Sequence, residues 1–112
     1  MNPIAIVHLL AALVMIGVCW PLARRKVKPN RWYGIRIPEA FKSDARWYEI
    51  NEYGGRLMIR WALVVAMMAG IGLVLPRPYW LAYVFCALAI MLAGLGIVVA
   101  LILRYAAKTR KS

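Results

Sequence analysis

The chain has 112 residues, of which 64% are hydrophobic, and it carries 15 Lys and Arg against four Asp and Glu. A soluble domain is usually about half apolar, whereas here the apolar residues form three long blocks with most of the charges between them. This distribution excludes a water-soluble fold and predicts an all-α integral membrane protein with one domain, residues 1–112. The net charge of +11 does not indicate a nucleic-acid ligand, because the bases flank the apolar blocks and no recognition motif accompanies them.

The first predicted transmembrane span covers residues 4–22, and His8 is its only side chain that can be charged near neutral pH. About 20 mostly apolar residues are enough for a helix to cross a bilayer. An ionisable residue inside a span is a functional candidate by default. His8 lies about one turn inside the span, where hydration or a hydrogen bond to a neighbouring helix is the alternative explanation.

The orientation follows from the distribution of basic residues. No Lys or Arg precedes the first span, nine lie between Arg24 and Arg56, and only Arg77 lies between the second and third spans. Basic residues concentrate on the cytoplasmic side of membrane proteins. We therefore expect the N-terminus outside, with the loop 24–56 and the C-terminus in the cytoplasm. The C-terminal tail adds four bases: Arg104, Lys108, Arg110 and Lys111.

The first part of this loop is predicted to be an irregular turn, because Pro29, Gly34 and Pro38 exclude a regular helix. Gly34 is available for positive φ, and the Asn30 side chain can close a turn. The turn also carries two aromatic residues beside two arginines, a combination that suits the headgroup region of a bilayer. These are Trp32 and Tyr33, with Arg31 and Arg36.

A short interfacial helix is expected next, with Ser43 as its N-cap and Asp44 in its first turn. Glu52 and Arg56 are spaced for an intrahelical ion pair. The glycines at 54–55 then allow a bend into the second span.

The second and third spans are predicted at residues 57–75 and 79–103, with Arg60 one turn inside the second and able to reach the inner headgroups. The connection at residues 76–78 is so short that the two spans must be antiparallel neighbours. Small residues at intervals of three or four predict where the helices pack closely. These are Ala66 and Gly70 on the second span, and Ala89, Ala93, Gly96 and Ala100 on the third.

The residue inventory gives little sign of catalysis. No nucleophile–base pair, metal-ligand cluster or phosphate-binding loop is present, so we expect a non-enzyme without cofactor, metal or catalytic residues. The four acids all lie in the basic loop, where local ion pairing is expected. Cys19 and Cys86 differ in predicted depth by roughly 10 Å, too far for a disulfide, and both are expected to be buried.

Two spaced blocks in the loop resemble the signature of the SdpI family of bacterial membrane proteins. The first is PNRWYGIR at residues 29–36, followed by Pro38. The second is W-x3-N-x3-G-R, formed by Trp47, Asn51, Gly55 and Arg56. The chain is identified as a short, three-helix member, and the resemblance implies a multi-pass protein of the bacterial cytoplasmic membrane.

The family's namesake is an immunity protein that protects a bacterium from its own secreted peptide toxin and that holds a transcriptional repressor at the membrane. The resemblance therefore implies toxin immunity, membrane signalling or both. A peptide toxin, a cytoplasmic repressor and anionic lipid headgroups are the expected partners. The candidate binding residues are Asn30, Trp32, Tyr33, Arg36, Trp47 and Asn51, and the residues expected to shape the motif are Gly34, Pro38, Gly55 and Arg56. The alternatives are a small lipid-binding protein and a homo-oligomeric assembly or transport protein.

Overall fold

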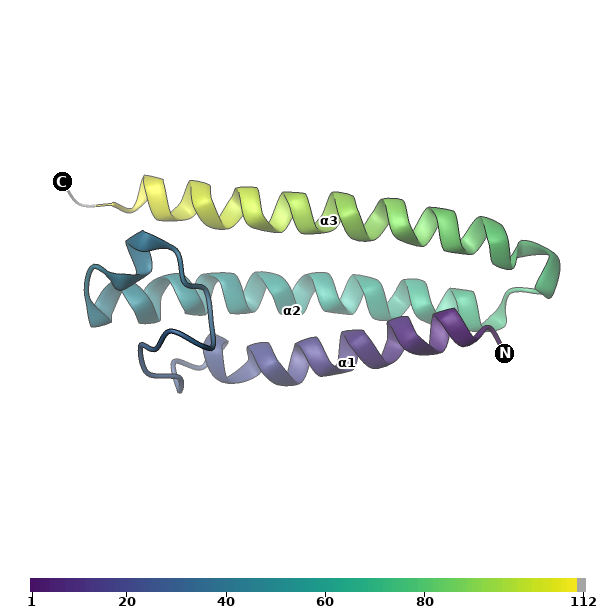
Figure 1. Ribbon diagram of the computed structural model, residues 1–112, viewed down its shortest axis with the longest axis horizontal. Coiled ribbons are helices and arrows are strands. Elements are labelled where there is room, and N and C mark those ends of the chain that lie inside the picture. The colour runs from purple at the N-terminus through teal and green to yellow at the C-terminus, as the bar shows by residue number, and fades with distance from the viewer. Residues whose placement is uncertain (111–112) are drawn as a thin grey trace.

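The computed structural model describes residues 1–110, which form three long helices connected by one long loop and one short loop. Helix α1 spans Pro3–Ala23, α2 spans Asp44–Val74 and α3 spans Trp80–Lys108, with short 3-10 helices η1 at Pro38–Phe41 and η2 at Arg77–Tyr79. The helices run side by side along a molecule 55 Å long (Figure 1). Lys111, predicted as part of the basic tail, lies outside the described residues.

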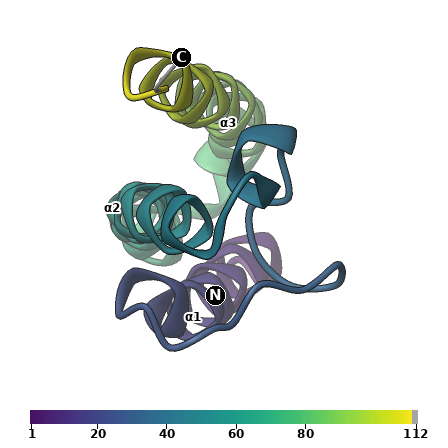
Figure 2. The same ribbon diagram turned by 90° about the vertical axis from the view of Figure 1, so that its left-hand side faces the viewer.

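The two ends of the bundle differ. The N-terminus and η2 lie at one end, which we call the hairpin end (Figure 1). Residues 24–43, which we call the capping loop, lie with the end of α3 at the other, the loop end (Figure 1). Viewed along the bundle, α2 lies between α1 and α3 (Figure 2).

All three helices are long and apolar enough to cross a membrane, which confirms the three predicted spans. Their outward surfaces carry large apolar side chains, such as Val14, Met67 and Phe85. A soluble protein rarely exposes so much contiguous apolar surface, whereas a lipid-facing helix requires it.

The second helix begins earlier than predicted. Ser43 is its N-cap and accepts a hydrogen bond from the Arg46 N–H at 3.1 Å, as predicted. The helix then continues without interruption to Val74, so the prediction of a separate short helix and a bend at residues 54–55 is wrong. Its 31 residues extend about 46 Å, well beyond the ~30 Å of hydrocarbon that a span must cross.

The helix stays straight because both glycines are used for close packing. A side chain at Gly54 would collide with the Ile35 side chain of the capping loop. A Cβ atom at Gly55 would lie 2.9 Å from the backbone nitrogen of Ala23 in α1. Glycine permits a bend without requiring one, and here the missing side chains admit neighbouring groups instead.

Small residues also allow α1 and α2 to pack closely along their length. They recur at intervals of seven residues, which keeps them on one face of each helix for several turns. All are buried: Ala5, Ala12 and Cys19 on α1, with Gly55, Ala62 and Ala69 on α2.

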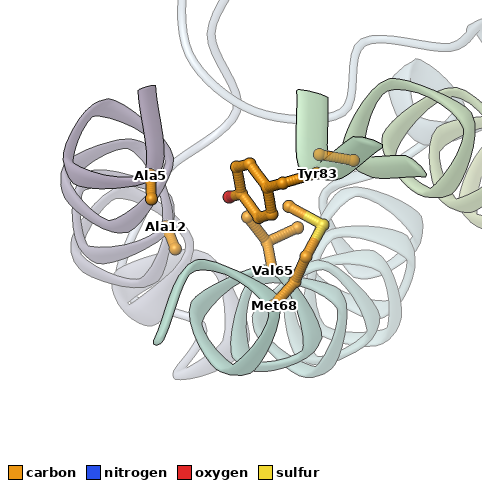
Figure 3. Close-up of a cluster of buried hydrophobic side chains, with 6 residues drawn as sticks. Ala5, Ala12, Val65, Met68 and Tyr83 are labelled. Atoms are coloured by element: carbon orange, nitrogen blue, oxygen red, sulfur yellow. The ribbon is translucent and has the colours of Figure 1, made fainter. Parts of the chain in front are cut away.

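The third helix returns antiparallel to α2, as the short connection predicted (Figure 1). The Trp80 indole N–H donates a hydrogen bond to the Leu75 carbonyl at 3.1 Å and so closes the turn. Tyr83 then points from α3 toward α1 and α2, close to Ala5, Val65 and Met68 (Figure 3). Its hydroxyl lies 2.7 Å from Nδ1 of His8, which joins α3 to α1.

The small residues predicted to mediate packing lie elsewhere. Ala66 is half-buried, but Gly70 and the four small residues of α3 are exposed on the outside of the bundle. Spacing shows which residues share a helix face, but it does not show whether that face meets another helix. Cys19 is buried and Cys86 is exposed, so the predicted burial of Cys86 is wrong; both are free thiols, as expected.

Because the α1 backbone lies so close to Gly55, the stability of the protein should be sensitive to a side chain at this position. Gly55→Ala should destabilise the protein by about 1–3 kcal/mol, because the new methyl group meets backbone atoms that have little freedom to move. Gly70→Ala is the matched control, since it lies in the same helix and has nothing within 4 Å of its Cβ position. Thermal unfolding in detergent should show a lower midpoint for Gly55→Ala than for Gly70→Ala. Equal midpoints would contradict the close packing of α1 and α2.

Candidate functional site

The capping loop is fixed to α2 by the side chain of Asn51, which is 1% exposed. Its Oδ1 accepts a hydrogen bond from the Ile35 N–H at 2.6 Å. Its Nδ2 donates to the Ile35 carbonyl at 3.3 Å and to the Trp47 carbonyl at 3.0 Å. One side-chain amide thus satisfies both backbone groups of Ile35, as a neighbouring β-strand would.

Trp47 lies one turn before Asn51 and is fully buried beneath the loop. Its indole N–H donates a hydrogen bond to the Val27 carbonyl at 2.9 Å. Its ring packs against Phe41 of the η1 region, with 5.5 Å between ring centres. Trp47 belongs to a buried cluster that also includes Val98, Ile102 and Ala106 of α3. The loop is therefore anchored at two points on α2 and packed against α3.

Gly34 is required at this position for two reasons. Its φ is +118°, a conformation that other residues rarely adopt, and the predicted positive φ is confirmed. A Cβ atom here would also lie 2.8 Å from Oδ1 of Asn51 and 3.0 Å from the Trp47 ring. The glycine thus lets the loop backbone reach the Asn51 amide.

Asn30 closes the turn that precedes Gly34, as predicted. Its Oδ1 accepts hydrogen bonds from the N–H groups of Trp32 at 2.9 Å and Tyr33 at 2.6 Å. Its Nδ2 donates to the Lys28 carbonyl at 2.8 Å. The Tyr33 hydroxyl donates to the Val18 carbonyl, which ties the turn to α1.

The outer surface of this turn is aromatic and basic. Trp32 is 89% exposed, the most exposed of the large apolar side chains. Arg31 and Arg36 are also exposed, and the Arg36 guanidinium donates to the Arg31 carbonyl at 2.6 Å. Arg31, Arg36 and Phe41 line a shallow hollow of about 440 Å³. This surface is available for contact with another molecule.

Arg46 joins three parts of the loop end and was not singled out from the sequence. Its guanidinium contacts Glu39 of η1 at 3.0 Å and Glu49 of α2 at 2.6 Å. It also donates to the Ala106 carbonyl at 3.0 Å and to the Thr109 hydroxyl at 2.9 Å, both at the end of α3. The i,i+3 spacing of Arg46 and Glu49 is visible in the sequence, but the contact with α3 is not.

Three of the four acids are ion-paired in the described structure. Glu52 contacts Arg25 and also Arg56, the latter at 3.3 Å as predicted. The hydrogen bond from Arg25 lowers the pKa of Glu52, with a further contribution from the charge of Arg56. The hydrogen bond from Lys42 likewise lowers the pKa of Glu39. These carboxylates therefore remain ionised at neutral pH, as their ion pairs require.

The two sequence motifs form one structural unit, because Gly34 and Ile35 of the first contact Trp47 and Asn51 of the second. Within this unit the candidate binding residues differ in accessibility. Trp32 and Arg36 face outward, Asn30 and Tyr33 are half-buried, and Trp47 and Asn51 are inside. Among the structural candidates, Gly55 packs against α1 and Pro38 opens η1. Asn51 and Trp47 bind the backbone of two loop residues that were not among the candidates from the sequence: Ile35, which lies within the first motif, and Val27, which lies before it.

These features define a multi-pass membrane protein with three helices and an inter-helix loop that folds back onto the end of the bundle. The profile of the SdpI/YfhL protein family matches residues 26–105, so the chain belongs to this family. The match covers both loop motifs, α2 and nearly all of α3. No curated protein and no solved structure matches the chain.

The hydrogen bonds of Asn51 predict that its side chain is needed to keep the capping loop folded onto α2. Asn51→Ala should destabilise the loop end by about 1–3 kcal/mol, because it removes the partners of Ile35 and leaves its N–H unsatisfied. Trypsin should then cleave the capping loop faster, at bases such as Lys26 and Lys42. Trp32→Ala is the control in the same loop, since the exposed Trp32 side chain makes few contacts that the substitution could remove. Equal cleavage rates in the two variants would contradict the anchoring role of Asn51.

Proposed function

We propose that this chain is a non-catalytic protein of the bacterial inner membrane, with its N-terminus outside and the capping loop and C-terminus in the cytoplasm. The orientation is supported by the concentration of Lys and Arg at the loop end and their near absence at the hairpin end. A non-catalytic role is supported by the ion pairs of Glu39, Glu49 and Glu52, because these carboxylates bind arginines of the same chain.

The proposed recognition surface is the outer side of the turn, and the exposure of Trp32 is the observation that carries the proposal. Trp32 is 89% exposed, yet the backbone beneath it is fixed by Asn30 and Asn51. A rigid backbone lowers the entropy lost on binding, and exposed Trp and Arg are the side chains that most often dominate binding energy. Arg31 and Arg36 give this surface a positive charge, which suits a partner with acidic groups.

Membership of the SdpI/YfhL family supports an immunity or signalling role for this surface. In this role the protein protects the cell from a secreted peptide toxin, holds a transcriptional repressor at the membrane, or does both. A turn on the cytoplasmic side is directly accessible to a repressor. A peptide toxin inserted in the bilayer would reach the same surface if Trp32, Arg31 and Arg36 lie at the level of the headgroups.

A challenge assay tests this proposal. A sensitive bacterium expressing the chain should survive the peptide toxin at least about tenfold better than cells without it, and Trp32→Ala, Arg36→Ala should lose that protection. The loss is expected because these variants remove exposed contacts while the bonds of Asn51 remain. Survival and the membrane level of each variant are the measurements.

The control carries the corresponding changes at the opposite end, Tyr79→Ala and Arg77→Ala, which also remove an exposed aromatic residue and an arginine. It should still protect. If the control loses protection while the loop variant keeps it, recognition lies at the hairpin end and the proposed surface is wrong. No protection by the unaltered chain would exclude immunity to that toxin.

A homo-oligomeric assembly is the second candidate, favoured by the small residues on the outside of α3. Ala89, Ala93, Gly96 and Ala100 follow one face of the helix, and all four are exposed. In lipid, a face of small residues allows two helices to approach closely.

The mass of the protein in mild detergent distinguishes a monomer from an oligomer. If α3 mediates self-association, the wild type should be a multiple of 12.7 kDa and Gly96→Leu should shift it toward the monomer. Gly70→Leu, on an exposed position of α2, serves as the control. A monomeric wild type would exclude this assembly.

A further inference from the structure

A cluster of three arginines lies at the loop end on the seam between α1 and α2. Arg24 follows the last turn of α1, and Arg56 and Arg60 are one turn apart on α2. Together with Trp20, Ala23 and Ile59 they line a hollow of about 320 Å³. The cluster is separate from the hollow at the proposed recognition surface, which is lined by Arg31, Arg36 and Phe41.

The positive charge in this hollow is largely unneutralised. No carboxylate is among its lining residues, and Arg24 and Arg60 form no ion pair within residues 1–110. Only Arg56 has an acidic partner, Glu52 at 3.3 Å, and its side chain remains 65% exposed. Arg46 differs, because it is nearly buried and paired with two glutamates. The arginines at the seam are thus left to attract an external anion.

The other walls of the hollow are apolar. Ile59 and Ala23 come from the two helices, and the indole of Trp20 is half exposed at its edge. The Arg24 guanidinium lies over the Trp20 ring, 5.1 Å from its centre. Arg60 is one turn further into the bundle than Arg56, or about 6 Å. Basic groups above apolar walls are the pattern of the boundary between headgroups and acyl chains.

We propose that this hollow binds the phosphate of an anionic phospholipid. Guanidinium groups pair with phosphate oxygens through directed, charge-assisted hydrogen bonds. With three arginines and no lining carboxylate, the hollow places an excess of positive charge beside the headgroup, so it favours a lipid with net negative charge. The apolar walls accommodate the start of the acyl chains, which inorganic phosphate lacks. The proposal does not depend on the immunity role.

Lipid competition followed by native mass spectrometry tests the site. Delipidated protein in detergent is mixed with equal amounts of phosphatidylglycerol and phosphatidylcholine, and the bound lipids are counted. The wild type should retain phosphatidylglycerol preferentially. Arg24→Gln, Arg60→Gln should reduce that preference by at least roughly fivefold, since each basic residue near a headgroup contributes measurably to binding. Each single variant should lose part of it, so the test does not depend on the double variant alone.

The control is Arg104→Gln, Arg110→Gln, which removes the same charge from exposed positions near the end of α3. It should keep the wild-type preference. If both double variants reduce the preference equally, overall charge is responsible and the site is wrong. A wild type without any preference would also overturn the proposal.

A third sample contains inorganic phosphate at millimolar concentration as a competitor. The proposal expects phosphatidylglycerol to stay bound, because the apolar walls contribute to lipid binding. If phosphate displaces the lipid and itself remains bound to the wild type but not to the Arg24→Gln, Arg60→Gln variant, the hollow is a site for free phosphate and the assignment to a lipid is overturned.

Discussion

The hydrogen bonds between the Asn51 amide and the backbone of Ile35 determine how the loop end is built. The capping loop has no strand or long helix of its own, so its backbone groups need partners from elsewhere. Asn51 supplies them from the rigid surface of α2. Gly34 then has to lack a side chain, and Ile35 is placed against Gly54. The turn that exposes Trp32 is a consequence of this one contact and of the Asn30 side chain.

The continuity of α2 gives this arrangement its rigidity. Trp47 and Asn51 belong to α2, which continues without a break along the length of the bundle. The capping loop that they bind is therefore fixed relative to α1 and α3. Gly55 adds to this because it admits the α1 backbone instead of bending the chain. A partner bound at the turn would therefore be held at a defined place above the bundle.

The basic residues divide into two groups with different consequences. Arg46 and Arg25 are paired with acids and hold α2, η1 and the ends of α1 and α3 together. Other arginines face outward without acidic partners in the described structure, among them Arg31 and Arg36 at the turn and Arg24 and Arg60 at the α1–α2 seam. The net charge of +11 thus includes two outward-facing basic surfaces at the loop end.

The sequence alone determined the three spans, the antiparallel hairpin, the Ser43 cap and the local geometry of Asn30 and Gly34, because each depends on hydropathy or on bonds within a few residues. It also identified the two motifs, but not that Asn51 is buried beneath Ile35. Only the tertiary structure decided that α2 stays straight at residues 54–55, that α1 and α2 pack through small residues seven apart, and that the small-residue face of α3 is outside. The physical reason is that a glycine, an alanine or an arginine has no fixed role until a distant segment lies beside it. Those contacts, such as Arg46 with Ala106, join residues too far apart in the chain for any local pattern to record.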